Sequence, residues 1–125
     1  MITYFEVDDL VEIASIVLGG TPQVRDAGLL SSAVVRPATV AFGQEAYPDL
    51  WSKAAALLHS VCMNHALIDG NKRLAWAAVR VFLALNEVPV RDVDVDEAET
   101  VVMSVASGTL TEIADIAREL RKLYL

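Results

Sequence analysis

Residues 54–85 read AAALLHSVCMNHALIDGNKRLAWAAVRVFLAL, and this stretch decides the fold. It contains two segments, residues 54–63 and 74–85, that are apolar on nearly every face of a helix. A helix that is apolar all round must be buried by its neighbours. The sequence therefore predicts a central, buried helical hairpin, with a polar loop of residues 65–73 at its mouth.

Helical periodicity continues outward from this hairpin over most of the chain. Asp26, Asp49 and Asp94 each precede a helical segment and can cap its first turn with their side chains. Gly19 ends the first predicted helix, and Pro37 ends the second. The predicted helices span residues 8–18, 26–35, 49–64, 71–87, 94–108 and 109–125.

The remaining segments are predicted to be connections. Thr109 and Glu112 have capping-box spacing and open the last predicted helix. Residues 43–48 are predicted to be a loop, and Pro89 makes residues 88–95 an extended connector rather than a core strand. The predicted fold class is all-α: a compact single-domain bundle of about six helices around the buried hairpin, covering residues 1–125.

Composition limits the kinds of protein that this chain can be. Its 125 residues are 54% hydrophobic, which fits one domain with a sizeable core. No apolar run reaches the roughly 18 residues of a membrane span. The first residues do not resemble a secretory signal, and the single Cys62 can form no internal disulfide, so we expect a cytoplasmic protein without a membrane partner. A net charge of −7 argues against a direct nucleic-acid partner.

The loop that joins the two apolar helices combines residue types that suit an anion. Gly70 permits backbone conformations that are closed to other residues. Asn71, Lys72 and Arg73 then occupy the first turn of the next helix, whose free N–H groups and dipole attract negative charge. Two cations at a helix N-terminus oppose that dipole unless an anion sits there, and such broken local rules tend to mark function.

Two further residues of the loop supply the other groups that a reaction at this anion site would need. The Asp69 carboxylate is a hard oxygen ligand of the kind that Mg²⁺ takes together with substrate phosphates. His65 is the only nearby group able to accept a proton near neutral pH. A base, a metal-binding carboxylate and a phosphate cradle within nine residues indicate transfer of a phosphorus-containing group to a hydroxyl.

The pattern His-x-x-x-Asp-Gly-Asn-Lys-Arg at residues 65–73 resembles the signature loop of the Fic/Doc superfamily, in particular its death-on-curing (Doc) toxin branch. The stretch RDAGLL at residues 25–30, followed by Arg36 and Pro37, resembles a second conserved segment of that branch. The triplet GTL at residues 108–110 is similar to its closing segment. The resemblance therefore covers nearly the whole chain.

This resemblance implies an all-helical Fic/Doc-like (Fido) fold that uses a nucleoside triphosphate to modify a protein hydroxyl. Doc toxins of type II toxin–antitoxin modules are understood to transfer the terminal phosphate of ATP, with Mg²⁺, to elongation factor Tu, which inhibits translation. A Phd-like antitoxin that binds through its C-terminal segment is implied as partner. By match of position, His65 would be the base, Asp69 the metal ligand, and the phosphate cradle would be Gly70, Asn71, Lys72 and Arg73.

Two departures from the Fic pattern bear on the reaction. Fic proteins that transfer AMP typically have Gly at the position of Lys72 and a second Arg at the position of Trp76. Both changes favour a kinase of the Doc type. A Fic-like adenylyl or other nucleotidyl transferase remains an alternative, as does a non-catalytic module of the same fold that binds a protein partner.

Several other residues are expected to be structural. His59 lies within an apolar helix, and we expect a hydrogen-bonded structural histidine. Arg80 falls two turns, about 10 Å, below Arg73, so we expect it to pair with a carboxylate or carbonyl rather than with ligand phosphate. Trp76 is expected to pack beside the core, as is Trp51, and Cys62 is expected to be unreactive in its apolar setting.

Overall fold

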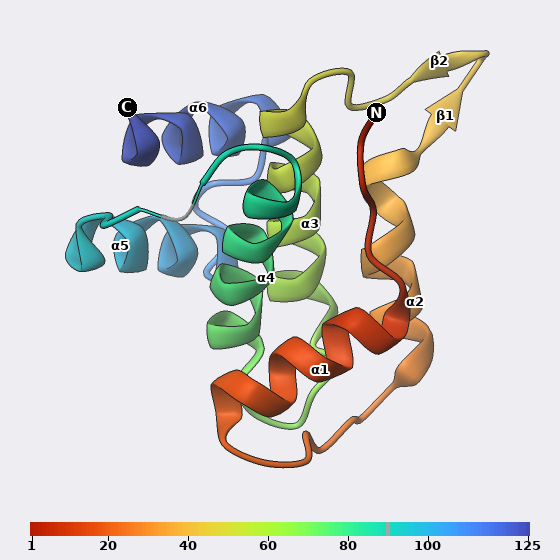
Figure 1. Cartoon of the computed structure of the whole chain (residues 1–125), viewed down its shortest axis with the longest axis vertical. Helices are drawn as coiled ribbons and strands as arrows, with labels where there is room; N and C mark the ends of the chain where they lie inside the picture. The colour runs from red at the N-terminus through yellow and green to blue at the C-terminus, as the bar shows by residue number, and fades with distance from the viewer. Residues whose placement is uncertain (90) are drawn as a thin grey trace.

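The structure is a computed structural model that describes residues 1–89 and 91–125. It is mostly helical, as the sequence predicted, and it also contains one very small sheet that the sequence did not predict (Figure 1). The helices are α1 (Val7–Leu18), α2 (Ala27–Val35), α3 (Leu50–Asn64), α4 (Asn71–Leu85), α5 (Val95–Ala106) and α6 (Ile113–Tyr124), with a short 3-10 helix (Arg36–Ala38) after α2. No helix in the described residues is long and apolar enough to cross a membrane.

The predicted hairpin of α3 and α4 stands at the centre of the molecule. The two helices run side by side in opposite directions, and both are covered by the others (Figure 1). Leu57 and Leu58 of α3, and Val79 and Phe82 of α4, are almost completely buried. The nearly all-apolar sequence of these helices follows from that position, since every face meets another element.

The four outer helices lie on two sides of the hairpin. Helix α1 contacts α4, and α2 contacts α3, on one side; α5 and α6 pack together against the other side (Figure 1). Ile116 and Leu120 of α6 are fully buried, and the ring of Tyr124 at the end of α6 packs at a tilt of 56° against the ring of Trp51, with centroids 5.6 Å apart. This arrangement leaves the loop between α3 and α4 at one end of the bundle, next to α1.

Four helix ends lie where the sequence predicted them. The Asp26 carboxylate accepts hydrogen bonds from the backbone N–H groups of Gly28 and Leu29, and Asp49 and Asp94 cap α3 and α5 in the same way. Gly19 ends α1 with a left-handed backbone at φ 79°. These confirmed positions share one cause, because each depends only on residues within one helical turn.

The predicted capping box of the last helix was wrong. Helix α6 begins after Glu112, without a side-chain cap, and the Thr109 hydroxyl pairs instead with the Ser107 hydroxyl at 3.0 Å. Helix α4 also ends at Leu85 rather than at residue 87, since the backbone of Glu87 turns left-handed at φ 74°. Competing local hydrogen bonds therefore displaced both boundaries.

The loop predicted for residues 43–48 is in part a small β-hairpin. Strand β1 (Val40–Ala41) pairs antiparallel with β2 (Gln44–Glu45) through a turn with positive φ at Phe42 and Gly43. Two-residue strands leave too short a pattern for sequence to reveal. Of the predicted connector at residues 88–95, Val90 lies outside the described residues, and residues 88–89 and 91–94 form neither helix nor strand.

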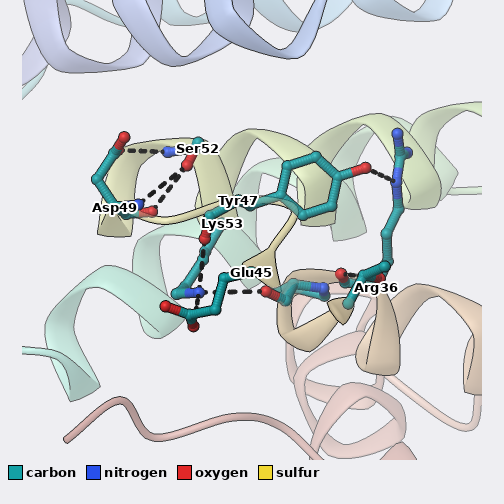
Figure 2. A network of polar contacts seen from close by, with 8 residues as sticks. Arg36, Glu45, Tyr47, Asp49, Ser52 and Lys53 are labelled. Carbon is teal, nitrogen blue, oxygen red and sulfur yellow. Dashed lines mark hydrogen bonds and ion pairs between the residues drawn. The ribbon is translucent and has the colours of Figure 1, made fainter. Parts of the chain in front are cut away.

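Lys53 ties this hairpin to the central helices. Its ammonium, on a side chain that is only 2% exposed, donates to the Glu45 carboxylate at 2.8 Å and to the Tyr47 carbonyl at 2.6 Å (Figure 2). A buried charge is tolerated only when it is paired and hydrogen-bonded, as here. The β-hairpin is thereby held at the end of α3 where the helix begins, far from the polar loop at its other end.

Candidate active site

The loop between α3 and α4 turns at two left-handed residues. His65 ends α3 with φ 52°, and Gly70 precedes α4 with φ 91°. Between them, Ala66 and Leu67 are buried and anchor the loop, whereas Asp69 is exposed. The loop is therefore fixed at its apolar residues and presents its polar ones to solvent.

Gly70 is required at its position for two reasons. Its φ of 91° lies in the left-handed region that side chains other than glycine rarely adopt. A Cβ atom there would also lie 2.6 Å from Cδ2 of Leu18, at the end of α1. An alanine at this position would therefore combine backbone strain with a shift of the Leu18 side chain.

The Asn71 side chain closes the loop on itself. Its Oδ1 accepts from the Leu67 N–H at 3.0 Å, and its Nδ2 donates to the Leu67 carbonyl at 2.9 Å. The amide is thus engaged within the loop, and only the backbone N–H of Asn71 could belong to the predicted phosphate cradle. The first N–H groups of a helix lack intrahelical acceptors, so this group suits an anion.

Arg25 holds the loop from outside, a role that sequence reasoning missed. Its Nε donates to the His65 carbonyl at 2.8 Å, and its guanidinium also reaches the Asn64 carbonyl at 3.2 Å. Beside it, Val24 forms a β-bridge with Leu67. These contacts join residues about 40 positions apart, so no local pattern could have revealed them; the only signal was that Arg25 begins the stretch resembling the Doc branch.

The structure brings all of the predicted site residues to one cavity. It has a volume of about 340 Å³ and is lined chiefly by the loop and the first turn of α4, with Cys62 and Ala106 behind. The predicted base, metal ligand and cradle all line it: His65, Asp69, Gly70, Asn71, Lys72 and Arg73. These six residues, which are close together in the sequence, therefore also lie around the same cavity.

The charged side chains that line this cavity are exposed to solvent. The Asp69 carboxylate lies 3.8 Å from the Arg73 guanidinium, and both side chains are well exposed. This weak contact offsets part of the conflict between Arg73 and the helix dipole. Lys72 is also exposed and has no acidic partner among residues 1–89 and 91–125 within ion-pair distance.

A single carboxylate is what the site offers a metal ion. No group of three or more His, Cys, Asp or Glu side chains that could hold a metal occurs in the described part of the chain. Asp69 alone fits Mg²⁺, which commonly keeps one or two carboxylates and takes its other ligands from water and substrate phosphates. This single carboxylate could therefore hold Mg²⁺ only together with ligands from water or phosphate.

Residues expected to be structural take structural positions. His59 Nδ1 accepts a hydrogen bond from Arg36 at 2.7 Å, and burial together with the Arg36 charge lowers the pKa of His59. Burial raises the pKa of the Cys62 thiol to about 12, so it stays protonated beside the cavity. Arg80 pairs with a carbonyl, as expected: its guanidinium donates to the Arg91 carbonyl at 3.2 Å. Trp76 is partly buried against the core.

Comparison with known proteins agrees with this geometry. The family model described as "Fic/DOC family" matches residues 4–83, which include α1 to α3, the whole polar loop and all but the last two residues of α4. A protein of Mycolicibacterium smegmatis (strain ATCC 700084 / mc(2)155) named "Toxin Doc" is 49% identical over 121 residues, covering 96% of this chain and 92% of that protein. These findings support a toxin function and a transferase type of enzyme. The chain therefore belongs to the Fic/DOC family.

Proposed function

We propose that this protein is a toxin that transfers the terminal phosphate of ATP to a hydroxyl of a translation factor. The observation that carries the proposal is the cavity that His65, Asp69, Lys72 and Arg73 line together. A proton acceptor, a carboxylate for Mg²⁺ and two cations for phosphate oxygens around one space are the parts that phosphoryl transfer needs.

Each residue has one task in this reaction. His65 takes the proton of the acceptor hydroxyl while that oxygen forms a bond to the terminal phosphorus. The bond from that phosphorus to its bridging oxygen breaks, and ADP leaves. Lys72 and Arg73, with the first N–H groups of α4, bind the phosphate oxygens and stabilise the charge that develops on them. Asp69 would hold Mg²⁺, which supplies further neutralisation of phosphate charge.

The cation content of the cradle supports phosphate transfer over AMP transfer. Lys72 and Trp76 stand where AMP-transferring Fic proteins have a glycine and a second arginine. One guanidinium and one ammonium are therefore available in this first turn of α4. Transfer of AMP or another nucleotidyl group is the second candidate, because the same base and metal ligand would serve it.

The proposal includes partners that follow from the family. We expect a Phd-like antitoxin that neutralises the toxin through its C-terminal segment, elongation factor Tu as the substrate, and a cytoplasmic location. The relative named "Toxin Doc" supports the toxin–antitoxin assignment. Co-expression of such an antitoxin should abolish growth arrest and raise the melting temperature of the toxin, since it binds only the folded state.

The test uses ATP labelled at either the α or the γ phosphate, with purified translation factors and antitoxin-free protein. We expect a factor to gain label from γ-labelled ATP only. Label from α-labelled ATP would replace the proposal by nucleotidyl transfer. Label from neither, with the protein folded and the factors intact, would favour a non-catalytic binding module.

A further inference from the structure

An apolar residue that the proposed reaction does not use lines the cavity around His65. Ile68 lies between His65 and Asp69 in the loop, and 65% of its surface is exposed. A single exposed apolar side chain is ordinary on a protein surface. The position of Ile68 is what calls for an explanation, because it lines the same space in which the acceptor hydroxyl meets His65 in the proposed reaction.

The backbone on both sides of Ile68 is held by hydrogen bonds. The N–H of Ile68 donates to the Gln23 carbonyl at 3.0 Å, and the N–H of Arg25 donates to the Ala66 carbonyl at 2.7 Å. Successive residues of an extended chain point to opposite faces, so the burial of Leu67 turns Ile68 toward solvent. Isoleucine is also branched at Cβ and has few rotamers. The loop therefore presents an apolar side chain that is already ordered, and a partner that covers it loses little entropy.

Different parts of the cavity lining are available to the two substrates. Lys72 and Arg73 belong to the first turn of α4 and bind phosphate oxygens in the proposed reaction, whereas His65 and Ile68 belong to the loop before that helix. A protein segment that places its hydroxyl at His65 therefore comes next to Ile68. An apolar side chain beside that hydroxyl would be buried together with Ile68, whereas a charged one would lose hydration against it.

We propose that Ile68 is a specificity-determining residue for the acceptor, and that it selects a serine or threonine with a bulky apolar neighbour in the substrate protein. The inference rests on the proposed function, because it concerns the acceptor of that reaction. Ile68 has no role toward the phosphates or the metal ion in this account. Its loss should therefore weaken recognition of the acceptor protein and leave the chemical step as it is.

The test is steady-state phosphorylation of purified elongation factor Tu with Mg²⁺-ATP. Ile68→Ala removes most of the apolar surface and adds no hydroxyl that could itself be phosphorylated. It should raise KM for the factor about fivefold or more, while kcat and KM for ATP change by less than about twofold. Ile68→Val keeps the branched Cβ and most of the apolar surface, so its KM for the factor should lie between those of the original chain and Ile68→Ala.

Val40→Ala serves as the control for these variants. Val40 is 62% exposed, much like Ile68, and lies in the β-hairpin far from the polar loop, so all three constants should stay unchanged. Mass-spectrometric mapping of the modified factor supplies a second measurement. We expect a bulky apolar residue directly before or after the phosphorylated serine or threonine.

Three results would overturn this inference and leave the proposed function in place. They are an unchanged KM for the factor in Ile68→Ala, a loss in kcat or in KM for ATP as large as the change in KM for the factor, and a modified residue without an apolar neighbour. An original chain that transfers no phosphate to elongation factor Tu would overturn the inference together with the proposed function.

Discussion

At the scale of single residues, His65 combines its proposed role as proton acceptor with an unusual backbone. Its φ of 52° is left-handed, a conformation in which asparagine and histidine are several times enriched among residues other than glycine. Substitution by alanine would therefore mix strain with loss of the imidazole. His65→Asn keeps a residue suited to this backbone and removes only the proton acceptor, so it is the appropriate inactive variant.

Alanine substitutions at three glycines can distinguish the cost of backbone strain from the cost of steric crowding. Gly70 has a positive φ and a close neighbour in Leu18, Gly19 has a positive φ and open space, and Gly20 has neither. We expect Gly20→Ala to leave the melting temperature unchanged or slightly raised. Gly19→Ala should lower the free energy of unfolding by about 1–2 kcal/mol, and Gly70→Ala by more. Thermal and urea unfolding of the three variants measures this order, and equal stability of Gly70→Ala and Gly20→Ala would contradict it.

At the scale of elements, the segment before α2 positions the loop before α4. Arg25 donates to the His65 carbonyl, and Val24 bridges to Leu67, so the extended chain at residues 23–25 forms one side of the site. These contacts are exposed and add little to global stability. Their effect should therefore be on the placement of His65 rather than on folding.

Arg25→Gln should lower kcat about 10- to 100-fold through misplacement of His65, with KM for ATP nearly unchanged, because the phosphate cradle belongs to α4. Steady-state kinetics on the same acceptor protein measures this split. Arg118→Gln on α6, an exposed arginine that pairs with Asp115, is the matched control and should leave both constants unchanged. A rise in KM with unchanged kcat would show that Arg25 acts on nucleotide binding instead.

The contact between the 3-10 helix and α3 should make stability depend on pH. Arg36 donates to His59 Nδ1, so the neutral imidazole is the form that fits, and the pKa of His59 is lowered by burial and by the Arg36 charge. A lowered folded-state pKa gives stability that is present above the unfolded value of 6.5 and is lost as pH falls below it. The melting temperature should therefore decrease between pH 7.5 and pH 5.

His59→Gln should make the melting temperature decrease less between pH 7.5 and pH 5, because glutamine offers an uncharged acceptor to Arg36 at every pH. His65→Asn, which leaves the contact between Arg36 and His59 intact, is the matched control. Thermal unfolding of the three proteins across this range measures the effect. The same slope in His59→Gln as in the unchanged protein would contradict the role assigned to His59.

At the scale of the whole molecule, sequence predicted what depends on periodicity and on neighbouring residues. The apolar helices of residues 54–63 and 74–85 were predicted to be central, Asp26 and Asp49 were predicted to cap helices, and the structure confirms both. The six proposed site residues lie within nine positions of the sequence, and the structure places all six around one cavity. Arg25 and the β-hairpin of residues 40–45 were missed, since the first acts across about 40 residues and the second has strands of two residues. Long-range pairing leaves no periodic signal.

The central claim is that His65 directs the terminal phosphate of ATP to a protein hydroxyl. Intact-mass measurement of elongation factor Tu after incubation with ATP, Mg²⁺ and the purified protein tests it most directly. We expect a gain of one phosphate with the original chain, and with His65→Asn a rate lower by about 10²- to 10⁴-fold, the usual loss for a general base. A gain of AMP in place of phosphate, or an equal gain of phosphate with His65→Asn, would contradict it.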